Sequence, residues 1–376
     1  MAIRPIVDPP DRTTRNSGVA RDVPRREVAG AWFLMLGYTV LLVGMVWDGQ
    51  WHGDVGPDNF WTAPHLLLYS GTAVIGLTCL IVVLLSTWSR GPATETPSVT
   101  VLRTFRAPWP FLVGGLGASA NLLYAAADLW WHELYGFDIA VGATPSHFGL
   151  GLSIQVEIFA MVMAFAVLRR TRAERWGLAL AIGIATIGST SAFGMASELI
   201  FSWLPGIAPR VLGLGAAAAL TLSLIVGLTR GWQWPAAAGL VFLVVQGGLA
   251  LFAPAATRWY ADAIDQPMRD YTTGLPQALI GFPVTFPLIA LLTGGIVAWA
   301  IRRGVSPVWT TALVGALAGI NTALFYSVVG MEMNLLATLA AVTVVGAGMG
   351  WLGWQCATML RMFGLRGPAA GGAVTA

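Results

Sequence analysis

Residues 30–48 read GAWFLMLGYTVLLVGMVWD, an unbroken apolar run that ends on an aspartate. As a helix rising about 1.5 Å per residue, the run is long enough to cross the hydrocarbon core of a bilayer. It shows no alternation of apolar and polar residues, so it does not fit a strand of a membrane β-barrel. Because backbone polar groups must be satisfied internally in lipid, the run predicts a transmembrane α-helix.

Runs of the same kind recur along the whole 376-residue chain, which is 56% hydrophobic and only 10% charged. Ten spans are predicted, at residues 30–48, 65–88, 109–128, 147–168, 176–198, 210–229, 236–255, 281–301, 307–328 and 335–357. The expected fold is therefore an all-α polytopic membrane protein with about ten transmembrane helices. The lipid bilayer is the first partner that this composition implies.

The basic residues predict how the spans are oriented. All 21 are arginines, and most lie before the first predicted span or in every second connection. The alternate connections hold only Arg210, Arg258 and Arg269. Because cytoplasmic loops carry the excess of positive charge, we expect a multi-pass plasma-membrane protein with both termini in the cytoplasm. The net charge of +3 follows from these arginines, and no nucleic-acid partner is expected.

All four histidines lie in two copies of one pattern. Each copy has an aspartate, a histidine four residues later and a second histidine beyond a short loop. The residues are Asp48, His52 and His65 in the first copy, and Asp128, His132 and His147 in the second. The first two residues recur 80 positions later and the last recurs 82 positions later. This spacing predicts a parallel tandem repeat of two helix–loop–helix units, with both loops on the extracytoplasmic side.

The pattern favours a metal site in each copy. Residues four apart on a helix share a face, so each aspartate and its first histidine project together from a span end. Pro64 and Pro145 mark the start of the helix that carries the second histidine. The alternative is a group of interfacial polar residues hydrogen-bonded across a bundle, but this leaves the matched spacing unexplained. Two histidines and one carboxylate suit non-haem iron, zinc and copper alike.

Three more acidic residues are candidates for supporting roles. Asp58 and Asp138 occupy equivalent loop positions, where each either holds an imidazole N–H or shapes a turn. Glu157 lies inside the fourth predicted span, where a carboxylate indicates a function such as a proton path or a lipid-headgroup contact. The polar and aromatic connection 257–280 either covers part of the protein or is a solvated connector.

The chain is expected to divide into four segments. Residues 1–28 are predicted to be a disordered basic cytoplasmic tail, and residues 29–168 the duplicated four-helix metal-binding unit. A six-helix membrane unit follows at 169–362, and then a flexible C-terminal tail at 363–376. The two cysteines lie on different spans and form no recognisable disulfide framework.

Residues 30–168 resemble the metal-binding segment of one membrane subunit of the copper membrane monooxygenases, the particulate methane and ammonia monooxygenase family. The likeness is carried by Asp48, Trp51, His52, Asp58, Phe60, Thr62, Pro64, His65 and Tyr69, and by Pro145, His147, Phe148 and Gly149. Asp128 departs from the family, which has asparagine there. The six later spans have no counterpart in the monooxygenase subunit.

The resemblance implies copper at both sets. Asp128, His132 and His147 would then form the catalytic centre, and Asp48, His52 and His65 a second centre for electron supply or structure. It also implies dioxygen activation, oxidation of a small apolar substrate, and partner membrane subunits or further copies of this chain. Two alternatives stay open. One is non-catalytic copper uptake, storage or sensing, and the other is a membrane protein that binds zinc or iron.

Overall fold

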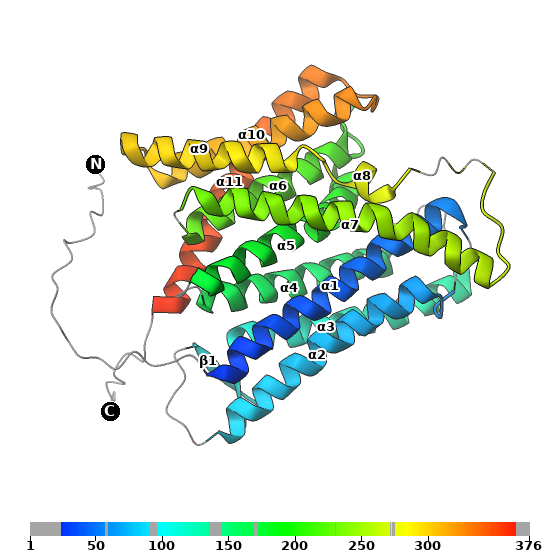
Figure 1. Ribbon diagram of the computed structural model, residues 1–376, viewed down its shortest axis with the longest axis horizontal. Helices are drawn as coiled ribbons and strands as arrows, with labels where there is room; N and C mark the ends of the chain where they lie inside the picture. The colour runs from blue at the N-terminus through cyan, green and yellow to red at the C-terminus, as the bar shows by residue number, and fades with distance from the viewer. Residues whose placement is uncertain are drawn as a thin grey trace.

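The computed structural model describes residues 24–56, 59–89, 96–135, 144–168, 172–229, 231–270, 272 and 275–365. Within them, ten helices are long and apolar enough to cross a membrane, which confirms the predicted all-α polytopic fold. These are α1 (Arg25–Asp54), α2 (Ala63–Trp88), α3 (Trp109–Tyr135), α4 (Pro145–Leu168), α5 (Arg172–Phe201), α6 (Pro209–Thr229), α7 (Gln233–Ala263), α9 (Phe286–Arg303), α10 (Pro307–Val328) and α11 (Leu335–Leu365) (Figure 1).

Helix ends differ from the predicted spans where polar residues or prolines intervene. Helix α1 begins at Arg25, inside the predicted tail, and continues to Asp54, so its last turns carry the first aspartate and histidine. The predicted span 281–301 is interrupted, because the short helix α8 (Gln277–Gly281) ends before Pro283 and α9 starts afterwards. Proline removes a backbone donor and cannot continue a helix without distortion. The rest of both predicted tails lies outside the described residues.

A small β-hairpin, which hydropathy did not predict, joins α2 to α3. Strands β1 (Ser98–Val101) and β2 (Phe105–Pro108) pair antiparallel, with Val99 opposite Ala107. Leu102 and Arg103 make the turn with φ of 50° and 58°, in the left-handed region that tight hairpin turns require. Four-residue strands are too short to stand out among long apolar runs.

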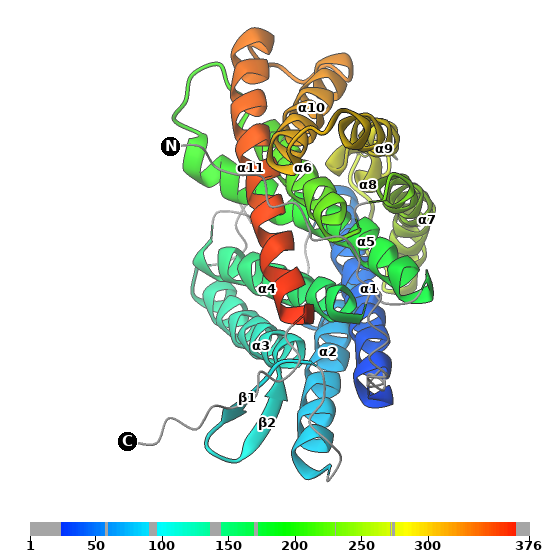
Figure 2. The ribbon, with the colours of Figure 1, turned by 90° about the vertical axis from the view of Figure 1, so that its left-hand side faces the viewer.

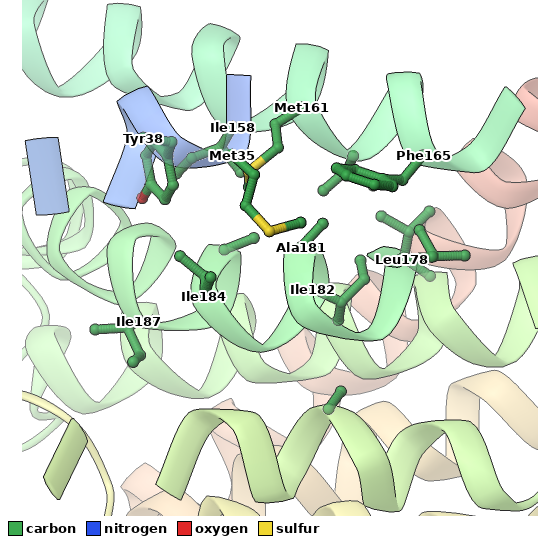
Figure 3. Packing of buried hydrophobic residues seen from close by; sticks show 14 of the residues in the cluster. Met35, Tyr38, Ile158, Met161, Phe165, Leu178, Ala181, Ile182, Ile184 and Ile187 are labelled. Carbon is green, nitrogen blue, oxygen red and sulfur yellow. The ribbon is translucent and has the colours of Figure 1, made fainter. Parts of the chain in front are cut away.

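The helices form two groups that share one core. Helices α1–α4 lie together, with α1 beside α2 and α3 beside α4, and α6, α10 and α11 form the second group (Figure 2). Helix α5 lies between the groups, while α7 packs on α1, α5 and α9. Figure 3 shows where α1, α4 and α5 meet, with Tyr38, Ile158 and Ile182 in one apolar cluster. The duplicated unit is therefore fused to the later helices by continuous packing.

Candidate metal centres

The first ligand set forms where α1 ends and α2 begins. Asp48 Oδ2 lies 3.6 Å from His52 Nε2, and Asp48 Oδ1 lies 3.2 Å from His65 Nε2. One ligand atom from each of the three residues lies within 4.8 Å of the others, close enough to share an ion. The side chains are about one-fifth exposed, so the set is neither sealed nor open to bulk solvent.

The second set repeats this arrangement at the end of α3 and the start of α4. Asp128 Oδ2 lies 3.4 Å from His132 Nε2, and Asp128 Oδ1 lies 3.1 Å from His147 Nδ1. The same 4.8 Å limit holds for its ligand atoms. The two sets therefore match in composition and topology. They differ in which nitrogen of the last histidine faces the carboxylate.

Close helix packing brings the two parts of each set together. In the first copy, Gly44 lies one turn before Asp48, and a Cβ at position 44 would lie 2.5 Å from Leu68 N. In the second copy, Tyr124 occupies the position equivalent to Gly44, and the small residue is instead Gly149 on the facing helix. A Cβ there would lie 2.2 Å from the Tyr124 ring. Each copy thus pairs one glycine with one larger residue, on opposite helices.

The start of α4 orients the second set. Thr144 precedes the helix, and its Oγ1 accepts a hydrogen bond of 3.3 Å from His147 N, which caps the helix. The same Thr144 oxygen lies 2.7 Å from His147 Nδ1. Ser146 Oγ donates a 2.7 Å hydrogen bond to Asp128 Oδ1. Hydroxyls therefore hold both the imidazole and the carboxylate of this set, as outer residues do in metal centres.

The orientation of His65 presents a ring nitrogen to the carboxylate of the first set. His65 Nδ1 lies 2.9 Å from the carbonyl oxygen of Asn59, and a carbonyl only accepts, so Nδ1 carries a hydrogen. Nε2 is then the ring nitrogen available to a metal, and it lies 3.2 Å from Asp48 Oδ1. A metal ion could be bound by both atoms.

The two sets are neighbours. Asp48 and Asp128 lie close enough to repel each other electrostatically, and His52 lies within electrostatic reach of both imidazoles of the second set. Two partly buried carboxylates at such proximity are unfavourable without a cation, because the protein interior screens charge less than water does. The pairing of the sets adds to the case for bound metal.

The connection after α7 is anchored on the end of α1, just beyond the first set. Arg269 N donates to Asp54 O at 2.8 Å, and Arg269 Nε donates to Val55 O at 3.1 Å. These bonds satisfy carbonyls at the end of α1 that have no partner within the helix. Gln50 Oε1 accepts a 2.8 Å hydrogen bond from Gln277 N. This segment thus closes over the end of α1.

The second set has no equivalent anchor among the described residues. Trp51 in α1 is fully buried and its ring lies 5.1 Å from that of Tyr260 in α7. Its counterpart in α3, Trp131, is half-buried, and its ring lies 4.6 Å from that of the exposed Tyr135. The ligands themselves are about equally exposed in the two sets, so the sets differ in their neighbours and not in their access to solvent.

A cavity of about 170 Å³ lies beside the second set, between α4 and α5. Its lining includes Phe148, Gly151, Gln155 and Met195. Gly151 and Gln155 follow His147 by four and eight residues, so they lie on the same face of α4 as that histidine. The lining is almost wholly apolar, and an apolar cavity of about 150 Å³ in a protein can hold benzene.

The structure thus brings together all six predicted ligands. Asp58 and Asp138 lie outside the described residues. Glu157 lies about three turns beyond the start of α4 and belongs to neither ligand set. Sequence reasoning missed the roles of Asn59 and Ser146. Ser146 directly precedes a predicted ligand, which is a local signal, whereas a backbone carbonyl such as that of Asn59 leaves no trace in the sequence.

Comparison of the chain with protein-family models, with curated proteins and with solved structures finds no match.

Proposed function

We propose that this membrane protein binds copper at its two Asp/His/His sets and oxidises a small apolar substrate with dioxygen at the second set. The observation that carries the proposal is the duplicated cluster, in which two imidazoles and a carboxylate converge within 4.8 Å. Imidazole with carboxylate is a donor set that copper accepts, as do zinc and iron. Copper is preferred because residues 30–168 resemble the metal-binding segment of the copper membrane monooxygenases.

The residues in and around the second set would have different roles. Asp128, His132 and His147 would hold the ion, and three protein ligands leave a coordination position open. Copper, when bound, would supply electron transfer to dioxygen. Ser146 fixes the carboxylate through its 2.7 Å hydrogen bond. The 170 Å³ cavity on the His147 face of α4 would hold the substrate, and it has room for a molecule of about the volume of benzene.

A second cavity supports approach of the substrate from the bilayer. It has a volume of about 670 Å³, lies between α2 and α3, and is lined by apolar residues from both helices and the hairpin. Its lining includes Thr72 and Leu122, which lie about two helical turns from His65 and Asp128. An apolar molecule dissolved in lipid could thus enter between α2 and α3, in a cavity that runs from the hairpin to within about two turns of the ligand sets.

The main alternative is a protein that takes up, stores or senses copper. Such a protein needs a path for the ion, and Met331 and Met333 are candidates because thioethers bind Cu(I). Both methionines pack against an apolar cluster that includes Val211 and Tyr326. This packing explains them without copper, so we favour the monooxygenase function over transport.

Metal analysis of the purified protein tests the copper assignment. Copper-replete protein should carry up to two equivalents, and His52→Ala and His132→Ala should each remove about one. Asp262→Asn, which changes an exposed carboxylate after the transmembrane part of α7, is the control and should keep both. Electron paramagnetic resonance would identify bound Cu(II). Zinc or iron alone in the replete protein would show that the assignment is wrong.

Asp128→Asn distinguishes a monooxygenase from a copper carrier. In a monooxygenase, the amide oxygen of the new side chain can still coordinate copper. The variant should therefore keep copper, and both the copper spectrum and the yield of oxidised product should change. In a carrier, the lost charge should weaken copper binding, with no oxidation product from either protein. Short alkanes, alkenes and ammonia are the substrates to screen, with reductant and membrane partners present. The absence of reductant-dependent oxygen consumption in that screen would exclude catalysis.

A further inference from the structure

At a similar depth along the helices from the two ligand sets, each helix of the duplicated unit contributes a buried polar side chain. These residues are Tyr38 in α1, Thr72 in α2, Asn121 in α3 and Glu157 in α4. Thr72 and Asn121 each lie seven residues from a ligand, and Tyr38 and Glu157 each lie ten. At about 1.5 Å per residue, the polar layer lies about 10–15 Å along the helices from the ligand sets.

The polar layer is not a product of the duplication. At the equivalent position in the other copy, each of its residues is replaced by an apolar one. The counterparts of Tyr38, Thr72, Asn121 and Glu157 are Ala118, Ile154, Leu41 and Ile75, respectively. An apolar residue therefore packs acceptably at each of these places in the repeat. Packing alone therefore does not explain why these four side chains are polar.

The layer is buried and largely lacks hydrogen-bond partners. Glu157 is 1% exposed, and neither of its carboxyl oxygens has a partner within the described residues. The same is true of the Tyr38 hydroxyl and of Asn121 Nδ2. Inside the layer, Thr72 Oγ1 donates a hydrogen bond of 3.3 Å to Asn121 Oδ1. Buried polar atoms are normally satisfied, so the unpartnered groups indicate a bound species.

The described surroundings of Glu157 contain no compensating cation. Gly117 faces it on α3, where a Cβ would lie 3.0 Å from Glu157 Cγ. The titratable groups that interact with it electrostatically are the Tyr38 phenol on α1 and the Cys79 thiol on α2. No arginine or histidine of the described residues acts on it. An unpaired carboxylate in such a place is strongly unfavourable, which favours the neutral acid.

We propose that Glu157 is a proton-binding site that balances the charge of the two metal centres. The carboxyl holds a proton when the centres are empty and releases it when they bind cations. On release, the O–H bond breaks, the electron pair stays on the carboxylate oxygen, and the proton passes to water. This proposal rests on the proposed metal binding, but not on the proposed monooxygenase activity.

The packing favours proton exchange toward the ligand sets. On the other side of Glu157, α4 continues with buried apolar residues that include Met161 and Phe165 (Figure 3). Met35 of α1 and Ile182 of α5 complete this apolar layer. Such a layer offers a proton no hydrogen-bonding partner, whereas Tyr38 lies within electrostatic reach of Glu157 in the polar layer.

Infrared spectroscopy of the purified protein in lipid nanodiscs tests the site directly. Metal-free wild type should show the C=O band of a protonated carboxyl, shifted in D₂O and lost in Glu157→Gln. Glu157→Asp should move the band, which keeps the assignment testable if the glutamine variant does not fold. Glu198→Gln changes an exposed glutamate on α5 and should leave the band in place. A missing band, or one unaffected by Glu157→Gln, would overturn the proposal.

Adding Cu(II) or redox-inert Zn(II), with uptake confirmed by elemental analysis, should reduce the wild-type band. Metal uptake without a change in the band would refute the charge coupling while leaving the metal function intact. Failure to bind either metal would refute the proposed function, and the metal-free band would still test the proton site. Replacing sodium by choline should change nothing. A band that appears only without sodium would identify a sodium site instead.

Discussion

At the scale of single residues, the two ligand sets differ in how their aspartates are held. Asp128 receives a hydrogen bond from Ser146, whereas the equivalent position in the first copy is Pro64, which has no side-chain donor. Asp48 Oδ1 is buried and accepts no hydrogen bond from the described residues. A hydroxyl therefore orients the second carboxylate, whereas the first has no equivalent hydroxyl donor.

Ser146→Ala should weaken metal binding at the second set only. Loss of an outer hydrogen bond to a ligand typically costs about 10- to 100-fold in metal affinity. Titration of the metal-free variant should therefore show one binding step weakened by that factor and the other unchanged. Ser70→Ala is a matched control, because Ser70 bonds only within its own helix, to Leu66 O. Equal weakening of both steps would contradict separate support of the two sets.

Gly151→Val should fill the 170 Å³ cavity without disturbing the ligands. A Cβ at position 151 would meet Met195 Cε at 3.4 Å, an ordinary contact with the end of a flexible side chain. Copper content should stay the same, while binding of benzene, measured by NMR or calorimetry, should be lost. Gly247→Val, where a Cβ would meet nothing within 4 Å, should bind benzene as wild type does. Unchanged benzene binding in Gly151→Val would place the substrate elsewhere.

At the scale of helices, each centre depends on a close contact between two neighbours in the chain. Gly44 lets the backbone of α2 approach α1 one turn below Asp48, and Gly149 makes room for Tyr124 in the second copy. The ligands are thus held by helix spacing as well as by their own side chains. A small change in this spacing should separate an aspartate from its second histidine.

Gly44→Ala should disrupt the first centre. The new methyl group would lie 2.5 Å from Leu68 N, and overpacking of this kind costs about 1–3 kcal/mol. Thermal unfolding should occur at lower temperature, and one of the two metal equivalents should be lost. Gly49→Ala, in the same helix with nothing within 4 Å, should keep both metals and the wild-type stability. A Gly44→Ala protein that binds two metals normally would contradict the spacing argument.

At the scale of the whole molecule, the arginine pattern predicts that both centres face outward. Single cysteines in a Cys79→Ser, Cys356→Ser background can test this. Cysteine at exposed positions Trp61 and Tyr135 should react with an impermeant maleimide in intact cells. Arg303 is exposed at the C-terminal end of α9, on the predicted cytoplasmic side. A cysteine at this position should react only after permeabilisation. The reverse result would place the centres in the cytoplasm.

The sequence was sufficient to predict the ten helices and the convergence of two Asp/His/His groups, because both depend on local patterns. Apolar length predicts a span, and the spacing of Asp48 and His52 predicts a shared helix face. The sequence left open whether the connection 257–280 is ordered against the protein, and the contact of Arg269 with Val55 was not predictable because the two residues are far apart in the chain. The interruption at Pro283 was missed because the run of apolar residues continues across it.

The contacts of Arg269 have a consequence for biosynthesis. Each ligand set joins two consecutive helices, so each is complete as soon as the ribosome has delivered that helix pair to the membrane. The segment that anchors the end of α1 is made only after α7. In a newly made chain, the carbonyls of Asp54 and Val55 therefore lack the hydrogen bonds from Arg269 until that later segment docks on them. The last turn of α1, and with it His52, should be held less firmly during this interval.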